Sequence, residues 1–266
     1  MDLLLSLQSA DELRIASGYS FRWLDLKNPL TGSLGCPEEK VAIEFLEVAE
    51  QLSSRNDWTL SVAIGELLEG TSAGAEDSVD THSQFSLPLS ARTLDGFDYV
   101  KVALAGSRDC KSWEARAESL SQQLRAPSKL ILVHYADHHL ACAVDWTTTL
   151  LTSRDLGCEY ILIDTFNKNG GRLTDWLSTD ESHRCATEAE RFGLKLSLAG
   201  SLRIEDLRTL EKTGASILGI RGAACLEGSR VSRLCRDRLQ ELSSCIVNER
   251  LATELRELGL SQRRSN

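Results

Sequence analysis

WLDLKNPLTGSLG occupies residues 23–35 and brings two charged side chains to the point where a predicted strand meets a loop. Side chains alternate across a strand, so Asp25 and Lys27 share one face and the leucines beside them share the other. Pro29 ends the strand, because it has no N–H and forces the preceding residue into an extended conformation. By itself this pattern fits either a surface ion pair or a catalytic carboxylate and amine, and the rest of the chain decides between them.

Apolar strand-like runs recur along the whole chain, and most are followed by a segment with helical spacing. The eight runs cover residues 1–6, 21–27, 59–65, 98–104, 130–135, 159–164, 195–200 and 216–221. Such alternation predicts parallel strands joined by right-handed crossovers. Eight units in about 250 residues predict a single-domain (β/α)8 TIM barrel. An open doubly wound sheet is the alternative, but no GxGxxG follows the first run.

The pattern divides the chain into a barrel of residues 1–230 and a C-terminal helical region of residues 231–266. Residues 66–90 lack periodicity and are predicted to form a long loop. The helical region ends in a frayed polar tail, and we regard it as a candidate surface for a homo-oligomer.

The composition limits the partners and compartments to expect. With 42% hydrophobic and 26% charged residues the chain is ordinarily globular, and its net charge of −9 argues against a nucleic-acid partner. The eight cysteines form no CxxC pair, which favours reduced thiols in a cytoplasmic protein. The first residues lack the basic flank of a signal peptide, and no run approaches the ~20 apolar residues of a membrane span.

Alternation within the strands also predicts which side chains line the barrel. In residues 59–65 the even positions are aliphatic and the odd positions are small or polar, so the aliphatic face should pack on the helices. By this rule charged side chains point inward near the carboxyl ends of strands two, four and six. They are Asp25, Lys27, Lys101 and Asp164, and Lys168 follows in the next loop. Barrel enzymes place their chemistry at this end, so we predict an active site, with a structural ion-pair cluster as the alternative.

A lysine attacks a carbonyl carbon only when its amine is neutral. The free pKa of lysine is ~10.4, so function near pH 7 requires a decrease of ~3 units, equivalent to about 4 kcal/mol. Burial and the neighbouring cations Lys101 and Lys168 are expected to lower the pKa of Lys27 in this way. The resulting imine is an electron sink, and Asp25 and Asp164 would carry protons or orient the amines.

Two glycine-containing loops are candidates for phosphate binding. Gly200-Ser201 follows the seventh strand, and Arg221-Gly222-Ala223 follows the eighth. Barrel enzymes bind phosphate at these positions through backbone N–H groups and a helix start, although each loop also fits an ordinary tight turn. Both loops together predict a small phosphorylated substrate.

The histidines give little support for a metal site. His138 and His139 are adjacent but have no partner set with ligand spacing, so neither a metal nor a cofactor is expected. His134 alternates into a strand and is predicted to be a core or pocket residue. Asp137 is predicted to make a polar loop contact.

Several blocks of the chain, in register from the first strand to the eighth, resemble one family. They are DLKNP at 25–29 with GSLG at 32–35, YVKV at 99–102, YAD at 135–137, DT at 164–165 with Lys168, LAGS at 198–201, and GIRGAAC at 219–225. Together they resemble the (5-formylfuran-3-yl)methyl phosphate synthase family of methanofuran biosynthesis, also called 4-(hydroxymethyl)-2-furancarboxaldehyde-phosphate synthase.

This resemblance implies a barrel lyase that condenses two molecules of glyceraldehyde 3-phosphate into a phosphorylated furan, with loss of phosphate and water. It further implies that Lys27 forms the Schiff base, that Lys101 accepts a proton, and that Asp25, Asp164 and Lys168 are essential. The residues alone predict only a Schiff-base enzyme for a phosphorylated carbonyl compound. The alternatives are another Schiff-base barrel enzyme of the sugar-phosphate aldolase type and a non-catalytic sugar-phosphate-binding protein.

Overall fold

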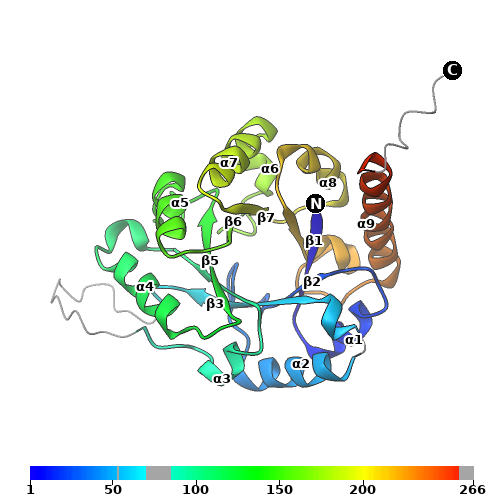
Figure 1. Ribbon diagram of the computed structural model, residues 1–266, viewed down its shortest axis with the longest axis horizontal. Coiled ribbons are helices and arrows are strands. Elements are labelled where there is room, and N and C mark those ends of the chain that lie inside the picture. Colours follow the sequence, from blue (N-terminus) through cyan, green and yellow to red (C-terminus); the bar gives the residue numbers. More distant parts are fainter. Residues whose placement is uncertain (53, 70–84, 258–266) are drawn as a thin grey trace.

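A computed structural model of the chain describes residues 1–52, 54–69 and 85–257, and eight parallel strands close into a barrel in it. The strands are β1 (Asp2–Leu7), β2 (Trp23–Leu26), β3 (Thr59–Glu66), β4 (Tyr99–Ala103), β5 (Lys129–Tyr135), β6 (Tyr160–Asp164), β7 (Lys195–Leu198) and β8 (Ile217–Ile220). Each strand pairs with the next, and β8 closes on β1 with Leu4 opposite Gly219 (Figure 1). The predicted TIM barrel is therefore confirmed, and the open sheet is excluded.

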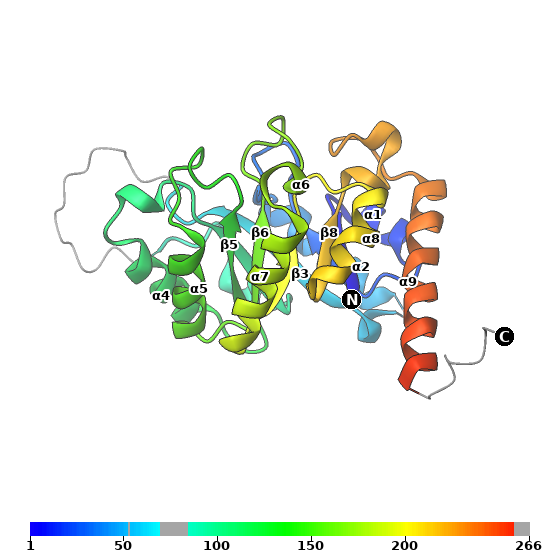
Figure 2. The ribbon, with the colours of Figure 1, turned by 90° about the horizontal axis from the view of Figure 1, so that it is seen from above.

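Helices surround the barrel on its outer side (Figures 1 and 2). They are α1 (Ala10–Ala16), α2 (Glu39–Gln51), α3 (Ala91–Leu94), α4 (Trp113–Gln123), α5 (Trp146–Asp155), α6 (Leu173–Trp176), α7 (Thr179–Arg191), α8 (Ile204–Leu210) and α9 (Arg236–Glu257). Capping residues fix several of their first turns. Ser9 accepts a hydrogen bond from the backbone N–H of Glu12 at the start of α1, and Asp145 accepts one from Thr148 at the start of α5.

Apolar side chains pack in two layers, one on each side of the barrel wall. The outer layer lies between strands and helices and includes Leu60 and Val62, as the strand alternation predicts. The inner layer contains an aromatic cluster of Trp23, Tyr99 and Tyr160, whose ring centroids lie 5.2 to 5.4 Å apart. Each of these three is the first residue of its strand. They therefore fill the amino-terminal end of the barrel and leave its carboxyl end to polar side chains.

The C-terminal region contains the long helix α9, which packs on the barrel through Leu239, Leu242 and Ile246. The sequence predicted helix from residue 231, but α9 begins at Arg236. Residues 225–235 instead fold back on themselves, with Cys225 opposite Leu234 in an antiparallel bridge. The domain boundary at residue 230 and assembly through the tail stay predictions.

The predicted loop at 66–90 is described only at its ends. β3 extends to Glu66, so this residue belongs to the sheet, and residues 85–90 lead into α3. The stretch 70–84 lies outside the described residues. Within the described ranges, none of the helices has the length and apolar character needed to span a bilayer.

Candidate active site

Asp25 and Lys101 meet inside the barrel. They lie on β2 and β4, with Lys101 Nζ 2.6 Å from Asp25 Oδ1, and both are buried. Ser61 on β3 and Ser6 on β1 donate hydrogen bonds to the same carboxylate at 2.7 and 3.2 Å. The carboxylate therefore has partners from three neighbouring strands. The predicted inward orientation of both residues is correct.

Asp164 and Lys168 form a second pair at the carboxyl end of β6. Lys168 Nζ lies 2.5 Å from Asp164 Oδ1 and 3.2 Å from Thr165 Oγ1. Asp164 also accepts hydrogen bonds from the backbone N–H of Thr165 and from Ser33 Oγ. Burial by itself would raise the pKa of Asp164, but the charges of Lys168 and Lys27 outweigh it and lower that pKa to about 2. Burial lowers the pKa of Lys168, and Asp164 opposes this effect.

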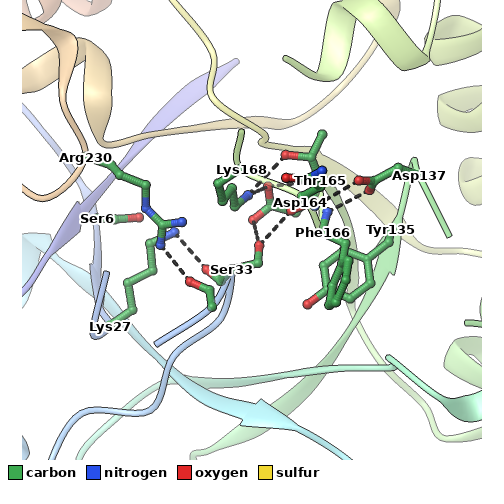
Figure 3. A network of polar contacts seen from close by, with 12 residues as sticks. Ser6, Lys27, Ser33, Tyr135, Asp137, Asp164, Thr165, Phe166, Lys168 and Arg230 are labelled. Carbon is green, nitrogen blue, oxygen red and sulfur yellow. Dashed lines mark hydrogen bonds and ion pairs between the residues drawn. The ribbon is translucent and has the colours of Figure 1, made fainter. Parts of the chain in front are cut away.

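Lys27 follows the last residue of β2 and faces Asp164 and Lys168 across the cavity (Figure 3). Among the described residues its nearest polar partner is distant, since Nζ lies 3.5 Å from the carbonyl oxygen of Ser33. Burial lowers the pKa of Lys27 to about 7. Asp164 raises the pKa, and Lys168 lowers it further. Lys27 is thus set apart as an amine that is largely free of partners and neutral in a large fraction of molecules near pH 7.

Asp137 holds the loop that carries Lys168. Its side chain is fully buried, and its two carboxylate oxygens accept hydrogen bonds from the backbone N–H groups of Phe166 and Asn167 at 2.7 and 2.9 Å (Figure 3). The predicted polar loop contact is therefore confirmed. It ties the end of β5 to the loop after β6.

A carboxylate and phenol pair next to this loop was missed by the sequence analysis. Tyr135 Oη donates to Glu66 Oε1 at 2.5 Å, and the backbone N–H of Ala105 donates to Glu66 Oε2 at 2.8 Å. Burial raises the pKa of both side chains. Glu66 was assigned to an irregular loop, so no signal in the sequence placed it beside Tyr135.

A cavity of about 680 Å³ opens at the carboxyl ends of the strands. Trp23 and Ile131 are among the apolar residues at its lining, and Lys27, Lys101, Asp164 and Lys168 are among the charged ones. Among the described residues, eight basic and three acidic side chains line it. The basic residues are Lys27, Lys101, Lys168, Arg172, Arg203, Arg221, Arg230 and Arg238, and the acidic ones are Asp164, Glu205 and Glu227. A chain with net charge −9 has thus gathered positive charge at one place, which suits a small anionic ligand.

The loops after β7 and β8 also line this cavity. Gly200 and Ser201 have φ values of +122° and +51°, a conformation that glycine adopts far more easily than other residues. No hydrogen bond from the described residues occupies the backbone N–H groups of Ser201, Leu202, Gly222 or Ala223. Such groups are able to bind a phosphate.

Arg221 is placed differently from its neighbours. Its guanidinium donates to both carboxylate oxygens of Glu12 at 2.8 and 3.2 Å and to the carbonyl oxygens of Ser6, Arg230 and Ser232. These five hydrogen bonds use all five donors of an arginine side chain. Any contribution of Arg221 to phosphate binding must therefore come from its backbone.

The histidines form a packed group beside α5. His134 is buried, its Nδ1 lies 3.3 Å from Thr149 Oγ1, and its ring lies 5.4 Å from that of His138. Burial lowers the pKa of His134 to about 3. Across the described residues, no group of three or more His, Cys, Asp or Glu side chains could hold a metal ion.

Lysines and carboxylates gathered at the carboxyl ends of barrel strands, around a cavity lined with positive charge, define a TIM-barrel enzyme with its site in the usual place. Comparison with known proteins then identifies the family. Residues 3–243 match the family model of 4-HFC-P synthase, and the chain belongs to this family.

Individual relatives agree with this assignment. The (5-formylfuran-3-yl)methyl phosphate synthase of Methanobrevibacter smithii is 32% identical over 212 residues, which are 78% of this chain and 82% of the relative. The protein of the same name from Methanocaldococcus jannaschii is 30% identical over 251 residues, 91% and 98% of the two chains. Phosphoribosyl anthranilate isomerase from Thermus thermophilus shares the fold, with a TM-score of 0.56 at 11% identity over 93% of this chain and 99% of that one. The resemblance seen in the sequence blocks is therefore confirmed at the level of the family.

Proposed function

We propose that the chain is a lyase that condenses two molecules of glyceraldehyde 3-phosphate into (5-formylfuran-3-yl)methyl phosphate in the biosynthesis of a methanofuran-type cofactor. The atom count of substrates and furan requires the release of one phosphate and two waters. The family assignment and the cation-lined cavity support this reaction. The observation that carries it is the state of Lys27, a buried amine whose pKa is lowered to about 7 beside two carboxylate–lysine pairs.

Lys27 is the proposed Schiff-base residue. Its neutral amine attacks the aldehyde carbon of one triose phosphate, and water leaves as the imine forms. Loss of the proton on the adjacent carbon gives an enamine, which expels phosphate from the third carbon. Coupling with the second triose phosphate, ring closure and dehydration complete the furan.

The two ion pairs have separate proposed roles. Asp164 and Lys168 face Lys27 across the cavity, so they are suited to exchange protons with the imine and enamine. Lys101, held by Asp25 on the neighbouring strands, is the proposed proton acceptor, a role that it fills in the steps in which its own amine has first given up a proton. Each role depends on geometry that the neighbouring serines and Asp137 maintain.

The loops after β7 and β8 are the proposed binding site for the phosphate that remains in the product. Gly200 and Ser201 from one loop, and Gly222 and Ala223 from the other, offer backbone N–H groups that no described residue occupies. Arg221 contributes only through its backbone and through the loop that it holds.

Reductive trapping tests the proposal. The purified protein is incubated with glyceraldehyde 3-phosphate and borohydride, and the adduct is mapped by mass spectrometry. In parallel the product is followed by the near-ultraviolet absorbance of the furan. We expect an adduct on Lys27 and furan from the unmodified protein, neither from Lys27→Arg, and both from Lys40→Arg, which changes an exposed lysine.

The remaining outcomes separate the alternatives. An adduct on Lys27 with a product other than the furan would favour the aldolase type of enzyme. Ligand binding without turnover would favour a sugar-phosphate-binding protein. Furan formation with no adduct on Lys27 would exclude the Schiff base.

A further inference from the structure

The loop between β8 and α9 brings a cation to the cavity that the sequence analysis did not single out. Arg230 lines the cavity together with Lys27 and Lys168. Figure 3 shows its side chain extending toward Lys27 and the chain around Ser33. Nη2 of Arg230 donates a hydrogen bond to the carbonyl oxygen of Gly32 at 2.7 Å. Its other guanidinium donors have no partner among the described residues.

Arg230 has no carboxylate partner among the described residues, which distinguishes it from three other arginines of the cavity. Those three have carboxylate partners, in the pairs Arg172 with Asp206 at 3.0 Å, Arg203 with Glu205 at 3.8 Å, and Arg221 with Glu12 at 2.8 Å. Arg230 has no ion pair within the described chain. The half-buried guanidinium has lost hydration, which the carbonyl oxygen of Gly32 replaces at only one of its donors, and Asp164 acts on it at long range without forming an ion pair. An anionic ligand would supply the missing partner.

The position of Arg230 is fixed by the surrounding loop. The buried guanidinium of Arg221 donates to the carbonyl oxygen of Arg230 at 2.6 Å and to that of Ser232 at 3.3 Å. The ends of the loop are joined by backbone hydrogen bonds from Leu226 to Arg233 and from Cys235 to Ala224. Arg230 is therefore held ready before a ligand arrives, which lowers the entropic cost of binding.

Arg238 provides a contrast. It also lines the cavity and also lacks a carboxylate partner in the part of the chain that the structure describes. However, no hydrogen bond to a described residue fixes its side chain. Arg230 is thus the better organised of the two free guanidinium groups.

We propose that Arg230 binds a second phosphate group, separate from the one held by the loops after β7 and β8, and that this is the phosphate released during the reaction. This assignment rests on the proposed function, in which two phosphorylated substrates enter and one phosphate leaves. When the enamine expels phosphate, the bond between the third carbon and oxygen breaks and the oxygen keeps the electron pair. The proton from the second carbon passes to a base of the site. The phosphate gains negative charge in this step, and a guanidinium fork stabilises that charge through paired hydrogen bonds.

The test compares Arg230→Gln with Arg233→Gln. Arg233 lies in the same loop, is exposed and does not line the cavity, so its variant makes the same charge change outside the site. Borohydride trapping on Lys27 is measured with glyceraldehyde 3-phosphate and with unphosphorylated glyceraldehyde. For Arg230→Gln we expect the half-saturating concentration of the phosphorylated aldehyde to rise about tenfold to hundredfold, and that of glyceraldehyde to stay the same. Arg233→Gln should match the unmodified protein with both aldehydes.

Calorimetric titration with inorganic phosphate provides a second readout, which does not depend on any reaction. The unmodified protein and Arg233→Gln should bind two phosphates per chain, and Arg230→Gln one. Arg230→Lys, which keeps the charge but loses the fork, should bind the second phosphate with intermediate strength. Thermal denaturation of each variant shows whether it is folded.

Two results would overturn the proposal. One is phosphate binding and trapping by Arg230→Gln that equal those of Arg233→Gln. The other is an equal loss of trapping with both aldehydes, since Arg230 would then act on the amine rather than on a phosphate. If the unmodified protein makes no furan but Arg230→Gln still loses one phosphate, the proposed function fails and the phosphate site stands without its leaving-group role.

Discussion

Asp25 and Lys101 form an ion pair in the interior of the barrel, with Oδ1 and Nζ 2.6 Å apart and neither side chain more than 4% exposed. Ser6 and Ser61 donate to the same carboxylate. Side chains from β1, β2, β3 and β4 therefore meet at one point. The pair belongs to the barrel wall as much as to the candidate active site.

Replacement of Asp25 by asparagine should destabilise the fold by about 3–5 kcal/mol, because Lys101 would stay buried without a counter-charge. The free energy of unfolding in urea measures this effect. Asp11→Asn is the control, since Asp11 is exposed and its pair with Arg14 spans 3.9 Å, so a change of no more than about 0.5 kcal/mol is expected. Equal stability of the two variants would contradict the prediction.

The pH dependence of imine formation should report the pKa of Lys27. Only the neutral amine attacks, so the trapping rate with glyceraldehyde should rise with pH and reach half its maximum at pH about 7. Lys168→Met should move this midpoint to higher pH. The substitution removes a charge that lowers the pKa of Lys27 and frees Asp164, which raises it. Lys40→Met should leave the midpoint in place, and an unchanged midpoint in Lys168→Met would refute the coupling.

Asp137→Asn should reduce turnover indirectly, because Asp137 positions the loop that carries Lys168 and does not itself line the cavity. An amide has one acceptor oxygen, so one of the N–H groups of Phe166 and Asn167 would lose its partner in a buried place. We expect a loss of stability of about 1–3 kcal/mol and, since Lys168 follows directly, a fall in kcat of roughly tenfold with a smaller change in KM. Asp155→Asn, in an exposed pair with Arg154, is the control. Unchanged kcat in a folded Asp137→Asn protein would show that the loop keeps its place without this carboxylate.

His134 should make the protein sensitive to acid. Its pKa is about 3 in the folded state and 6.5 in an ordinary environment, so the unfolded chain binds the proton more readily. Stability is therefore fully present above pH 6.5 and is lost progressively as the pH falls from 6.5 toward 3. The free energy of unfolding is measured at neutral and at mildly acidic pH for the unmodified protein and for His134→Asn. The decrease on acidification should be smaller in His134→Asn, because only the carboxylates then contribute to it. A variant that keeps the full acid sensitivity of the unmodified protein would exclude this role.

Much of this arrangement was predictable from local patterns. Alternation within strands placed Asp25, Lys101 and Asp164 on the inner face, and the parallel order of strands brought their carboxyl ends together. Burial among other lysines predicted the lowered pKa of Lys27. These features follow from residue chemistry and strand period, which a sequence displays directly.

Contacts made by irregular segments were not predictable. Arg230 is the last residue of the predicted barrel and had no predicted role. Its position depends on a hydrogen bond from Arg221, whose side chain comes close only in the folded barrel. Glu66 was assigned to a loop, although β3 extends far enough to bring it to Tyr135. Ser33 reaches Asp164 across 131 positions of the chain. Such contacts depend on the three-dimensional path of loops, for which no periodicity exists.

The central carboxylate on β2 also has a consequence for how sequences in this lineage can diverge. One side chain joins four adjacent strands and also lies near the amine that we propose as the nucleophile. A mutation at this position that removes the proposed chemistry should therefore also weaken the barrel. Gene copies that drift toward a new activity would therefore retain this aspartate longer than the loops around it. Substitutions should therefore accumulate first in the loops around the cavity and last in the strands that form the barrel wall.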